Sequence, residues 1–170
     1  LEQRSALIAN VVNGIISIGA TFVGIALLDR VGRRPMMLLG FTGTTLSLLL
    51  IGLVSVFVDP SVTRAMLILA AMAMFLACMQ GLIGPAFWVL LAEIFPMRIR
   101  GGCMGMAIAA FWLTNVMIGM FFPSLVATLG IGQTFFVFVG AGLLSLTFVA
   151  VWVPETRGST LEEIEQRLYG

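Results

Sequence analysis

The chain has 170 residues, of which 60% are hydrophobic and 10% are charged, and its formal net charge is +1. Soluble domains carry roughly 25% charged residues, so this composition excludes an ordinary soluble domain and indicates a lipid bilayer as the solvent. The small net charge does not suggest nucleic-acid binding, and Cys78 and Cys103 have no spacing typical of a metal site or a disulfide framework.

Charged residues are clustered in this sequence, and long uncharged stretches separate the clusters. A helix that crosses the hydrocarbon core needs roughly 20 apolar residues, and backbone groups in lipid must be paired within the helix. We therefore predict an all-α membrane protein with residues 1–154 as its transmembrane part and 155–170 as a tail. The five predicted helices lie near residues 5–28, 35–58, 65–92, 101–125 and 131–153, with a break at Gly130-Ile131-Gly132.

The arginines predict the orientation of these helices. On one side of the membrane lie Arg4 and Arg64, and on the other Arg30, Arg33, Arg34, Arg98, Arg100, Arg157 and Arg167. The side richer in arginine is expected to be cytoplasmic, which predicts a multi-pass cell-membrane protein with a cytoplasmic C-terminal tail. The first residue then lies outside, and because no signal peptide precedes it, we expect an odd number of earlier spans.

Small residues and prolines indicate where helices approach or bend. Residues spaced by four predict two close-packing faces, one with Gly101, Gly105 and Ala109 and one with Ala20 and Gly24. Pro85 and Pro123 fall inside the third and fourth predicted helices. Each removes a backbone hydrogen bond, so we expect a kink or local opening that faces protein or a cavity.

No constellation typical of an enzyme is present: the sequence has no histidine and no acidic pair inside a predicted span. We therefore expect neither an enzyme nor a bound metal or cofactor. Burying an unpaired amide costs about 2–7 kcal/mol, so polar residues at membrane depth need partners. The uncharged polar and aromatic candidates are Asn10, Asn13, Gln80, Trp88, Trp112 and Asn115.

Two explanations compete for these residues. Hydrogen bonds between helices are one, and we favour that explanation for Asn10 and Asn115. A polyhydroxylated ligand is the other, because its hydroxyls bond amides and its C–H face stacks on aromatic rings. Gln80 and Trp88 are eight residues apart, slightly more than two helical turns, so α-helical spacing predicts that they share a face near Gly84.

The charged clusters at the predicted cytoplasmic side contain both signs. They are either solvated loops with a positive-inside bias or a network of ion pairs that breaks and reforms as helices move. Exposed pairs contribute only about 0–1 kcal/mol, which suits a reversible latch. The candidate members of the network are Asp29, Arg30, Arg33, Arg34, Glu93, Arg98, Arg100, Glu155 and Arg157.

Three motifs stand in a specific order. They are Asp29-Arg30-Val31-Gly32-Arg33-Arg34-Pro35, then Gly84-Pro85-Ala86-Phe87-Trp88 through Ala92-Glu93-Ile94-Phe95-Pro96, and finally Pro154-Glu155-Thr156-Arg157-Gly158. In this order they resemble motifs of the sugar porter family of the major facilitator superfamily. The resemblance implies that the five spans are helices eight to twelve and that seven are missing, which agrees with the odd number required by the arginines.

The resemblance also implies roles for residues. It places Gln80, Gly84 and Trp88 at a sugar site, together with Trp112 and Asn115 of the eleventh helix. Phe111 departs from the pattern, because hexose and xylose carriers usually have Asn or Gln at this position. The surrounding stretch looks closer to bacterial inositol and polyol carriers.

We therefore expect a fragment of a sugar or polyol transporter, with inositol as a candidate substrate, that works by alternating access. Its expected partners are the solute, the bilayer and the missing N-terminal half. Proton symport and facilitated diffusion both remain open. The alternative is a membrane protein that does not transport, either a sugar sensor or a scaffold.

Overall fold

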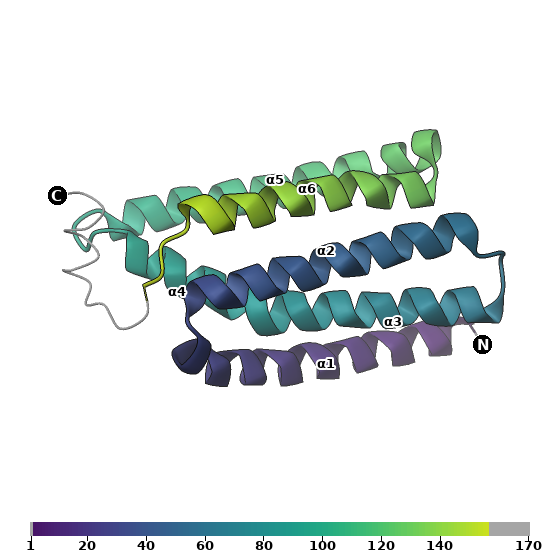
Figure 1. The fold of residues 1–170 in the computed structure, drawn as a ribbon, viewed down its shortest axis with the longest axis horizontal. Coiled ribbons are helices and arrows are strands. Elements are labelled where there is room, and N and C mark those ends of the chain that lie inside the picture. Colours follow the sequence, from purple (N-terminus) through teal and green to yellow (C-terminus); the bar gives the residue numbers. More distant parts are fainter. Residues whose placement is uncertain (1, 157–170) are drawn as a thin grey trace.

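The computed structural model describes residues 2–156, except for the side chains of residues 2–10, 12, 13 and 29. The elements are α1 (Glu2–Val31), α2 (Arg33–Phe57), α3 (Val62–Cys78), the π-helical turn η1 (Met79–Ile83), α4 (Gly84–Ile94), α5 (Arg100–Leu129) and α6 (Ile131–Trp152). Because α3, η1 and α4 are continuous, they form one span, and the spans lie side by side (Figure 1). The five predicted helices are confirmed, and their ends shift by a few residues.

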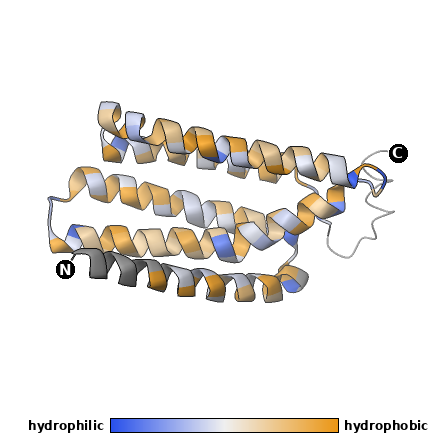
Figure 2. Cartoon of the chain, turned by 180° about the vertical axis from the view of Figure 1, so that it is seen from behind, coloured by the Kyte–Doolittle hydropathy of each residue, from blue (hydrophilic) through white to orange (hydrophobic). Residues whose placement is uncertain are grey.

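The long helices have the character of membrane spans. Within the part that the structure describes, four helical stretches are long and apolar enough to cross a membrane, namely Arg33–Phe57, Val62–Ile94, Arg100–Leu129 and Ile131–Trp152. The apolar part of α1 whose side chains are described, Gly14–Leu28, is shorter. Hydrophobic residues run along the helices, and hydrophilic residues gather mainly towards their ends (Figure 2). The predicted all-α membrane architecture is confirmed.

Single glycines form two of the connections. Gly32 joins α1 to α2 with φ of 100°, and Gly130 joins α5 to α6 with φ of 86°. Side chains other than that of glycine rarely tolerate this left-handed region. Both turns therefore reverse the chain within one residue. The break predicted at Gly130-Ile131-Gly132 is present at Gly130 alone, because Ile131 and Gly132 belong to α6.

The α2 helix packs between α6 and α3 (Figure 1). Small residues bring α2 and α6 together: a Cβ added to Gly52 would come to 3.1 Å from the Phe136 ring and 3.4 Å from the Gly132 carbonyl oxygen. Further along, a Cβ added to Gly142 would overlap the Thr45 hydroxyl. The α2–α6 contact thus depends on glycines that were not predicted as packing positions from the sequence.

The two predicted small-residue faces have different outcomes. Ala20 and Gly24 do contact the backbone of η1, since a Cβ on Gly24 would overlap the Gly81 carbonyl oxygen. Gly101 and Gly105 have nothing within 4 Å of an added Cβ among the described residues. The described α5 helix buries none of its residues, so this second face has no packing partner in the described chain.

The two prolines also differ. Pro85 is the second residue of α4, just after η1, so the predicted opening of the third span is present as a π-helical turn. Pro123 lies inside α5, which remains α-helical to Leu129. The Pro123 side chain is exposed on the described chain, and that it faces protein or a cavity stays a prediction.

Candidate functional site

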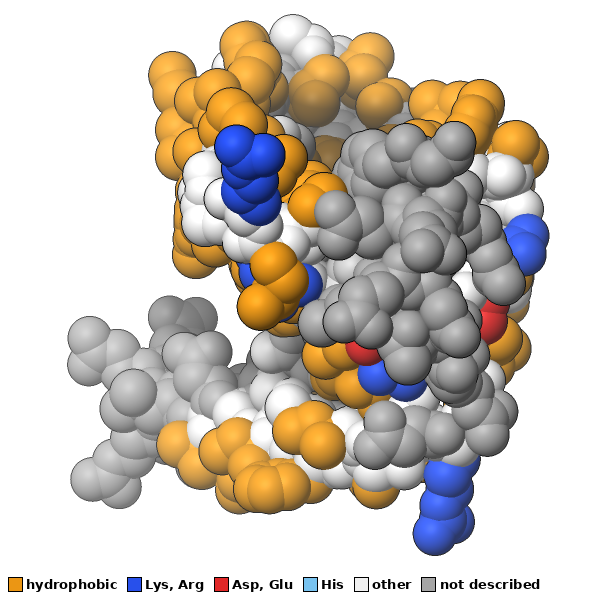
Figure 3. All heavy atoms as spheres, turned by 90° about the vertical axis from the view of Figure 1, so that its left-hand side faces the viewer, with side chains coloured by type: hydrophobic (Ala, Val, Ile, Leu, Met, Phe, Trp, Pro, Cys, Tyr) orange, Lys and Arg blue, Asp and Glu red, His pale blue; other side chains and the backbone are white. Residues whose placement is uncertain are grey.

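Polar contacts gather at the end of the bundle where α2 begins and α4 ends. We call this region the charged end and define it by Arg33, Glu93, Glu155 and Thr156. Figure 3 looks onto this end, where basic and acidic side chains lie among hydrophobic ones. The charged end brings together segments that are far apart in the sequence.

Glu155 caps the start of α2. Its two carboxylate oxygens accept hydrogen bonds from the backbone N–H groups of Arg33 at 3.1 Å and Arg34 at 3.2 Å. Pro35 has no N–H, so one carboxylate satisfies both donors among the first three helical residues. A Cβ on Gly32 would come to 2.8 Å from Glu155 Oε2, so glycine leaves room for the cap. The negative charge also suits the positive end of the helix dipole.

Glu93 binds a different partner with each carboxylate oxygen. Oε1 pairs with Arg33 Nη2 at 2.8 Å, and Oε2 accepts a hydrogen bond from the Thr156 hydroxyl at 2.6 Å. Arg33 Nη1 also donates to the Leu28 carbonyl at 3.4 Å. The Arg33 and Glu93 side chains are only 13% and 20% exposed. The pair is therefore more enclosed than the exposed loop pairs expected from the sequence, and its charge-assisted hydrogen bond is stronger than one in open water.

Two further predicted arginines hold backbone carbonyls. Arg34 Nη2 donates to the carbonyl of Ala150, near the end of α6. Arg100 Nε donates to the carbonyl of Phe95 at 3.2 Å, across the turn between α4 and α5. Arg34 thus ties α2 to α6, and Arg100 closes a local turn.

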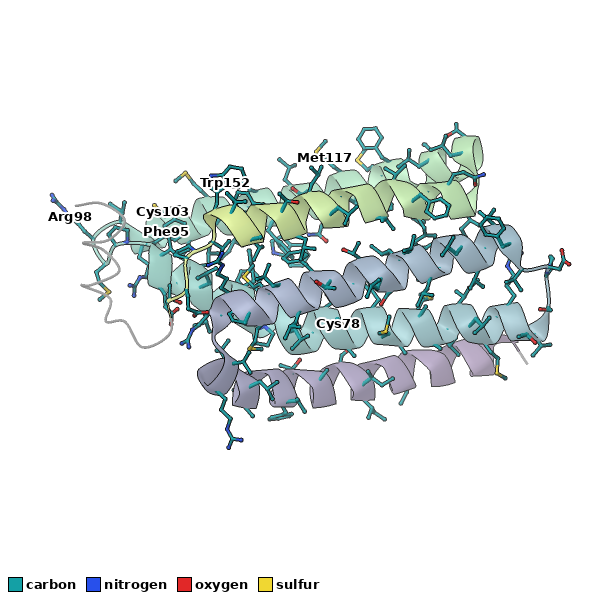
Figure 4. All side chains as sticks on the ribbon, viewed as in Figure 1. Cys78, Phe95, Arg98, Cys103, Met117 and Trp152 are labelled. Atoms are coloured by element: carbon teal, nitrogen blue, oxygen red, sulfur yellow. The ribbon has the colours of Figure 1, made fainter. Side chains whose placement is uncertain are left out.

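The rest of the predicted network lies apart from these contacts or outside the described residues. Arg30 and Arg98 are exposed and make no hydrogen bond or ion pair with described residues, and Arg98 reaches away from the bundle (Figure 4). The Asp29 side chain and Arg157 lie outside the described part. Thr156 was missed as a member, although its position beside Glu155 in the third motif was an available signal.

Four rings form what we call the aromatic cluster: Phe87, Trp88, Phe111 and Trp112. Phe111 stands between the two indoles, with ring centroids 5.7 Å from Trp88 and 5.6 Å from Trp112, both edge to face. Phe87 lies 5.1 Å from Trp88 and 6.1 Å from Phe111. Trp88 is 39% exposed and Trp112 61% exposed. The cluster therefore connects α4 with α5 and leaves indole surface open.

Gln80 has different neighbours. It is exposed and lines a recess of about 240 Å³ towards α1, which also includes Ser17 and Thr21. Gln80 lies beside α1, and Trp88, eight residues further along the same span, lies beside Phe111 of α5. That the two side chains share a face of the span stays a prediction.

Gly84 and Asn115 complete the predicted binding residues. A Cβ on Gly84 would come to 3.3 Å from the Met79 carbonyl oxygen and 3.9 Å from Gln80 Oε1, so this position closes the π turn. Asn115 Nδ2 donates to the Phe111 carbonyl at 2.8 Å. This bond lies within α5. The sequence had favoured a bond between two helices for Asn115. The Asn10 side chain lies outside the described part.

The cysteines do not form a site with each other. Cys78 on α3 and Cys103 on α5 are free thiols, and they lie at different levels along the bundle (Figure 4). Among the described residues, no group of three His, Cys, Asp or Glu side chains could hold a metal ion.

A bundle of long apolar helices with one charged end defines a polytopic α-helical membrane protein. The chain belongs to the family described as "Sugar (and other) transporter", which matches residues 1–168. This agrees with the resemblance found in the three motifs.

Individual relatives extend this assignment. The chain is 47% identical to the "Major myo-inositol transporter IolT" of Bacillus subtilis (strain 168), over 97% of this chain and 35% of that protein. It is 45% identical to the "Putative metabolite transport protein YncC" of the same organism, over 96% of this chain and 35% of that protein. The chain thus spans about a third of the length of these relatives.

Solved structures show the same fold. The proton:xylose symporter XylE bound to 6-bromo-6-deoxy-D-glucose matches with a TM-score of 0.87 and 32% identity, over 97% of this chain and 35% of that one. The inward-open conformation of XylE from E. coli matches with a TM-score of 0.85 and 31% identity, over 96% and 36%. The arrangement of the described helices is therefore that of a major facilitator transporter.

Proposed function

We propose that this chain is the C-terminal part of a carrier that moves a small polyhydroxylated solute, of the inositol or sugar class, across the cell membrane by alternating access. Its membership of a transporter family supports this, as does its 47% identity to a myo-inositol transporter over 97% of the chain. Its spans correspond to helices eight to twelve, and the substrate site lies between them and a preceding half of the carrier.

The aromatic cluster is the observation that carries the proposal. Trp88 and Trp112 come from two different helices and keep part of their indole surface open on either side of Phe111. A ring polyol has an apolar C–H face that stacks on such surfaces and hydroxyls that bond amides. Gln80 and Asn115, on the same two spans, supply amide groups.

Phe111 suggests the selectivity of the carrier. It stands where hexose carriers usually have an amide, and its ring is held between Trp88 and Trp112. An apolar wall discriminates between solutes by only about 1–3 kcal/mol, whereas an unpaired amide rejects a wrong solute more strongly. We therefore expect broad or inositol-type selectivity.

The charged end acts as the latch of this carrier. It lies on the arginine-rich side, which is the cytoplasmic side by the positive-inside rule. Glu93, Arg33 and Thr156 join the ends of α2, α4 and the segment after α6 in one conformation. Alternating access moves such packed elements against each other, so these bonds stabilise one state of the cycle and break in the other.

Uptake measurements test the proposal. The full-length protein that contains this chain is reconstituted into vesicles and supplied with labelled myo-inositol, glucose or xylose. Saturable uptake, strongest for myo-inositol, is the expected result. Binding without uptake would favour a sensor, and neither binding nor uptake would favour a scaffold.

The same vesicles distinguish the two transport mechanisms. An inward proton gradient should accelerate uptake in a symporter, and a protonophore should abolish the acceleration. A rate that does not respond to either treatment identifies facilitated diffusion.

A further inference from the structure

The backbones of α1 and η1 meet at two buried glycines. A Cβ added to Gly24 would overlap the carbonyl oxygen of Gly81 and come to 3.0 Å from Pro85 Cγ. In the opposite direction, a Cβ added to Gly81 would come to 3.1 Å from the carbonyl oxygen of Ala20. A side chain at position 24 would therefore overlap the backbone of η1, whereas one at position 81 would require its neighbour to shift by only a few tenths of an ångström.

Pro85 explains why the Gly81 carbonyl faces α1. In an α-helix the N–H of residue 85 would donate to the carbonyl of residue 81, and proline has no N–H. The turn closes instead with the N–H of Gly84 donating to Met79, a five-residue step. The Gly81 oxygen lies against the Cα of Gly24, an arrangement typical of a weak Cα–H···O contact between helices.

The π turn sets the relative direction of two candidate ligand groups. Gln80 lies within η1 and faces the recess that Ser17 and Thr21 line. Trp88, on the α4 side of the turn, packs against Phe111. An α-helical turn has 3.6 residues and a π turn has more, so losing the π turn would rotate Gln80 relative to Trp88.

We propose that Gly24 is a positioning residue for the substrate site. Because Gly24 has no side chain, the Gly81 carbonyl can pack against its backbone, and this contact stabilises η1. The stabilised turn keeps Gln80 directed into the recess, while α4 holds Trp88 in the aromatic cluster. A methyl group at position 24 pushes the carbonyl away and moves η1 off α1, which changes the direction of Gln80. This inference rests on the transport function proposed above.

Substrate affinity in the full-length protein tests the inference, with labelled myo-inositol as the probe in reconstituted vesicles. Gly24→Ala should raise KM about tenfold, and the maximal rate per folded molecule should change less. Gly19→Ala is the matched control, because it lies on the same helix with nothing within 4 Å of an added Cβ. Its KM should stay within about twofold of the parent value. Equal KM values in the two variants would overturn the inference.

A second substitution separates positioning from general damage. Pro85→Ala removes the Cγ that crowds position 24 and supplies an N–H for the Gly81 carbonyl. The double variant Gly24→Ala/Pro85→Ala should therefore have a KM within about threefold of that of Pro85→Ala alone. If the fold-changes in KM of the two single variants multiply in the double variant, the substitutions act independently, and Gly24 does not act through this carbonyl.

A milder variant covers the case in which Gly24→Ala does not accumulate in the membrane. Gly81→Ala makes only the 3.1 Å contact with Ala20, and it should raise KM about threefold. An unchanged KM in Gly81→Ala would contradict the inference. If the parent protein takes up neither myo-inositol nor a hexose, the proposed function fails and the inference fails with it. Uptake by the parent, with no difference among the variants, refutes the inference alone.

Discussion

Thr156 donates a hydrogen bond to Glu93 across 2.6 Å, although 63 residues separate them in the sequence. Thr156 is only 3% exposed, so water does not compete for the bond. Arg33 holds the other oxygen of the same carboxylate. The orientation of Glu93 is therefore fixed from two sides, and the segment after α6 is part of the proposed latch.

Replacing Thr156 should loosen the latch. Valine keeps the shape of threonine and lacks the hydroxyl, so Thr156→Val should lower the free energy of unfolding by about 1–3 kcal/mol, the scale of a buried hydrogen bond to a charged group. Thr156→Ser keeps the donor and should retain most of the stability. Thermal unfolding of the purified full-length protein measures both. The same melting temperature in the two variants would contradict this role of the hydroxyl.

Glu93→Gln should change the transport rate more than substrate binding. Glutamine keeps the size of the side chain and removes the charge that pairs with Arg33, which weakens the latched state by about 1–3 kcal/mol. Accessibility labelling at both membrane faces should then show a shifted balance of inward- and outward-open states. Arg98→Gln, at an exposed position, is the control and should change neither quantity. If Glu93→Gln changes neither the accessibility labelling nor the transport rate, the Arg33–Glu93 pair has no role in transport.

Trp88→Ala should weaken myo-inositol binding by about 1–3 kcal/mol, because an aromatic platform and its contact area are lost. Trp152→Ala provides the control: Trp152 is 68% exposed, stacks on Phe148 of α6 and lies outside the aromatic cluster. Equilibrium binding to equal amounts of protein gives the comparison. Equal affinities in the two variants would remove Trp88 from the binding site.

Phe111→Gln should raise the affinity for a hexose relative to myo-inositol. Glutamine restores the donor and acceptor that hexose carriers usually have at this position. The substitution also removes the ring between Trp88 and Trp112, so both absolute affinities should change. The ratio of the two affinities is therefore the quantity to measure. A constant ratio in parent and variant would show that Phe111 supports the cluster without facing the solute.

Gly142→Ala should destabilise the packing of α6 on α2. The new methyl would overlap the Thr45 hydroxyl, and overpacking of this kind costs about 1–3 kcal/mol. Gly140→Ala is two residues away on the same helix and has nothing within 4 Å of its added Cβ. Alanine is about 1 kcal/mol more favourable than glycine in a helix, so this control should be neutral or slightly stabilising. Thermal unfolding that ranks the two variants in the opposite order would refute the packing argument.

The spans could be predicted because their signal is local. An uncharged stretch of about 20 residues in lipid has little choice but to form a helix, and Gly130 marks a turn through its own backbone freedom. The glycines between α2 and α6 could not be predicted. Whether Gly142 or Gly140 meets a neighbour depends on how one helix is rotated against another, which no short stretch of sequence determines.

The site was predictable in its residue types and less so in its pairings. An acid at the end of α4 and another after α6 indicated a network, yet only the tertiary fold shows that Glu93 binds a side chain and Glu155 binds backbone N–H groups. Likewise, Pro85 indicated an opening in the third span. It did not indicate that this opening takes the form of a π turn.

The cap on α2 has a consequence for biosynthesis. Glu155 follows Arg33 by 122 residues, so its carboxylate is made long after the helix that it caps. At a synthesis rate of about 5–20 residues per second, the first turn of α2 waits roughly ten seconds for its acceptor. During that interval the turn depends on water or lipid headgroups for hydrogen bonds. The last span, α6, must therefore leave the ribosome before α2 has its final hydrogen-bond partners. The capping of α2 by Glu155 is thus a late step in assembly.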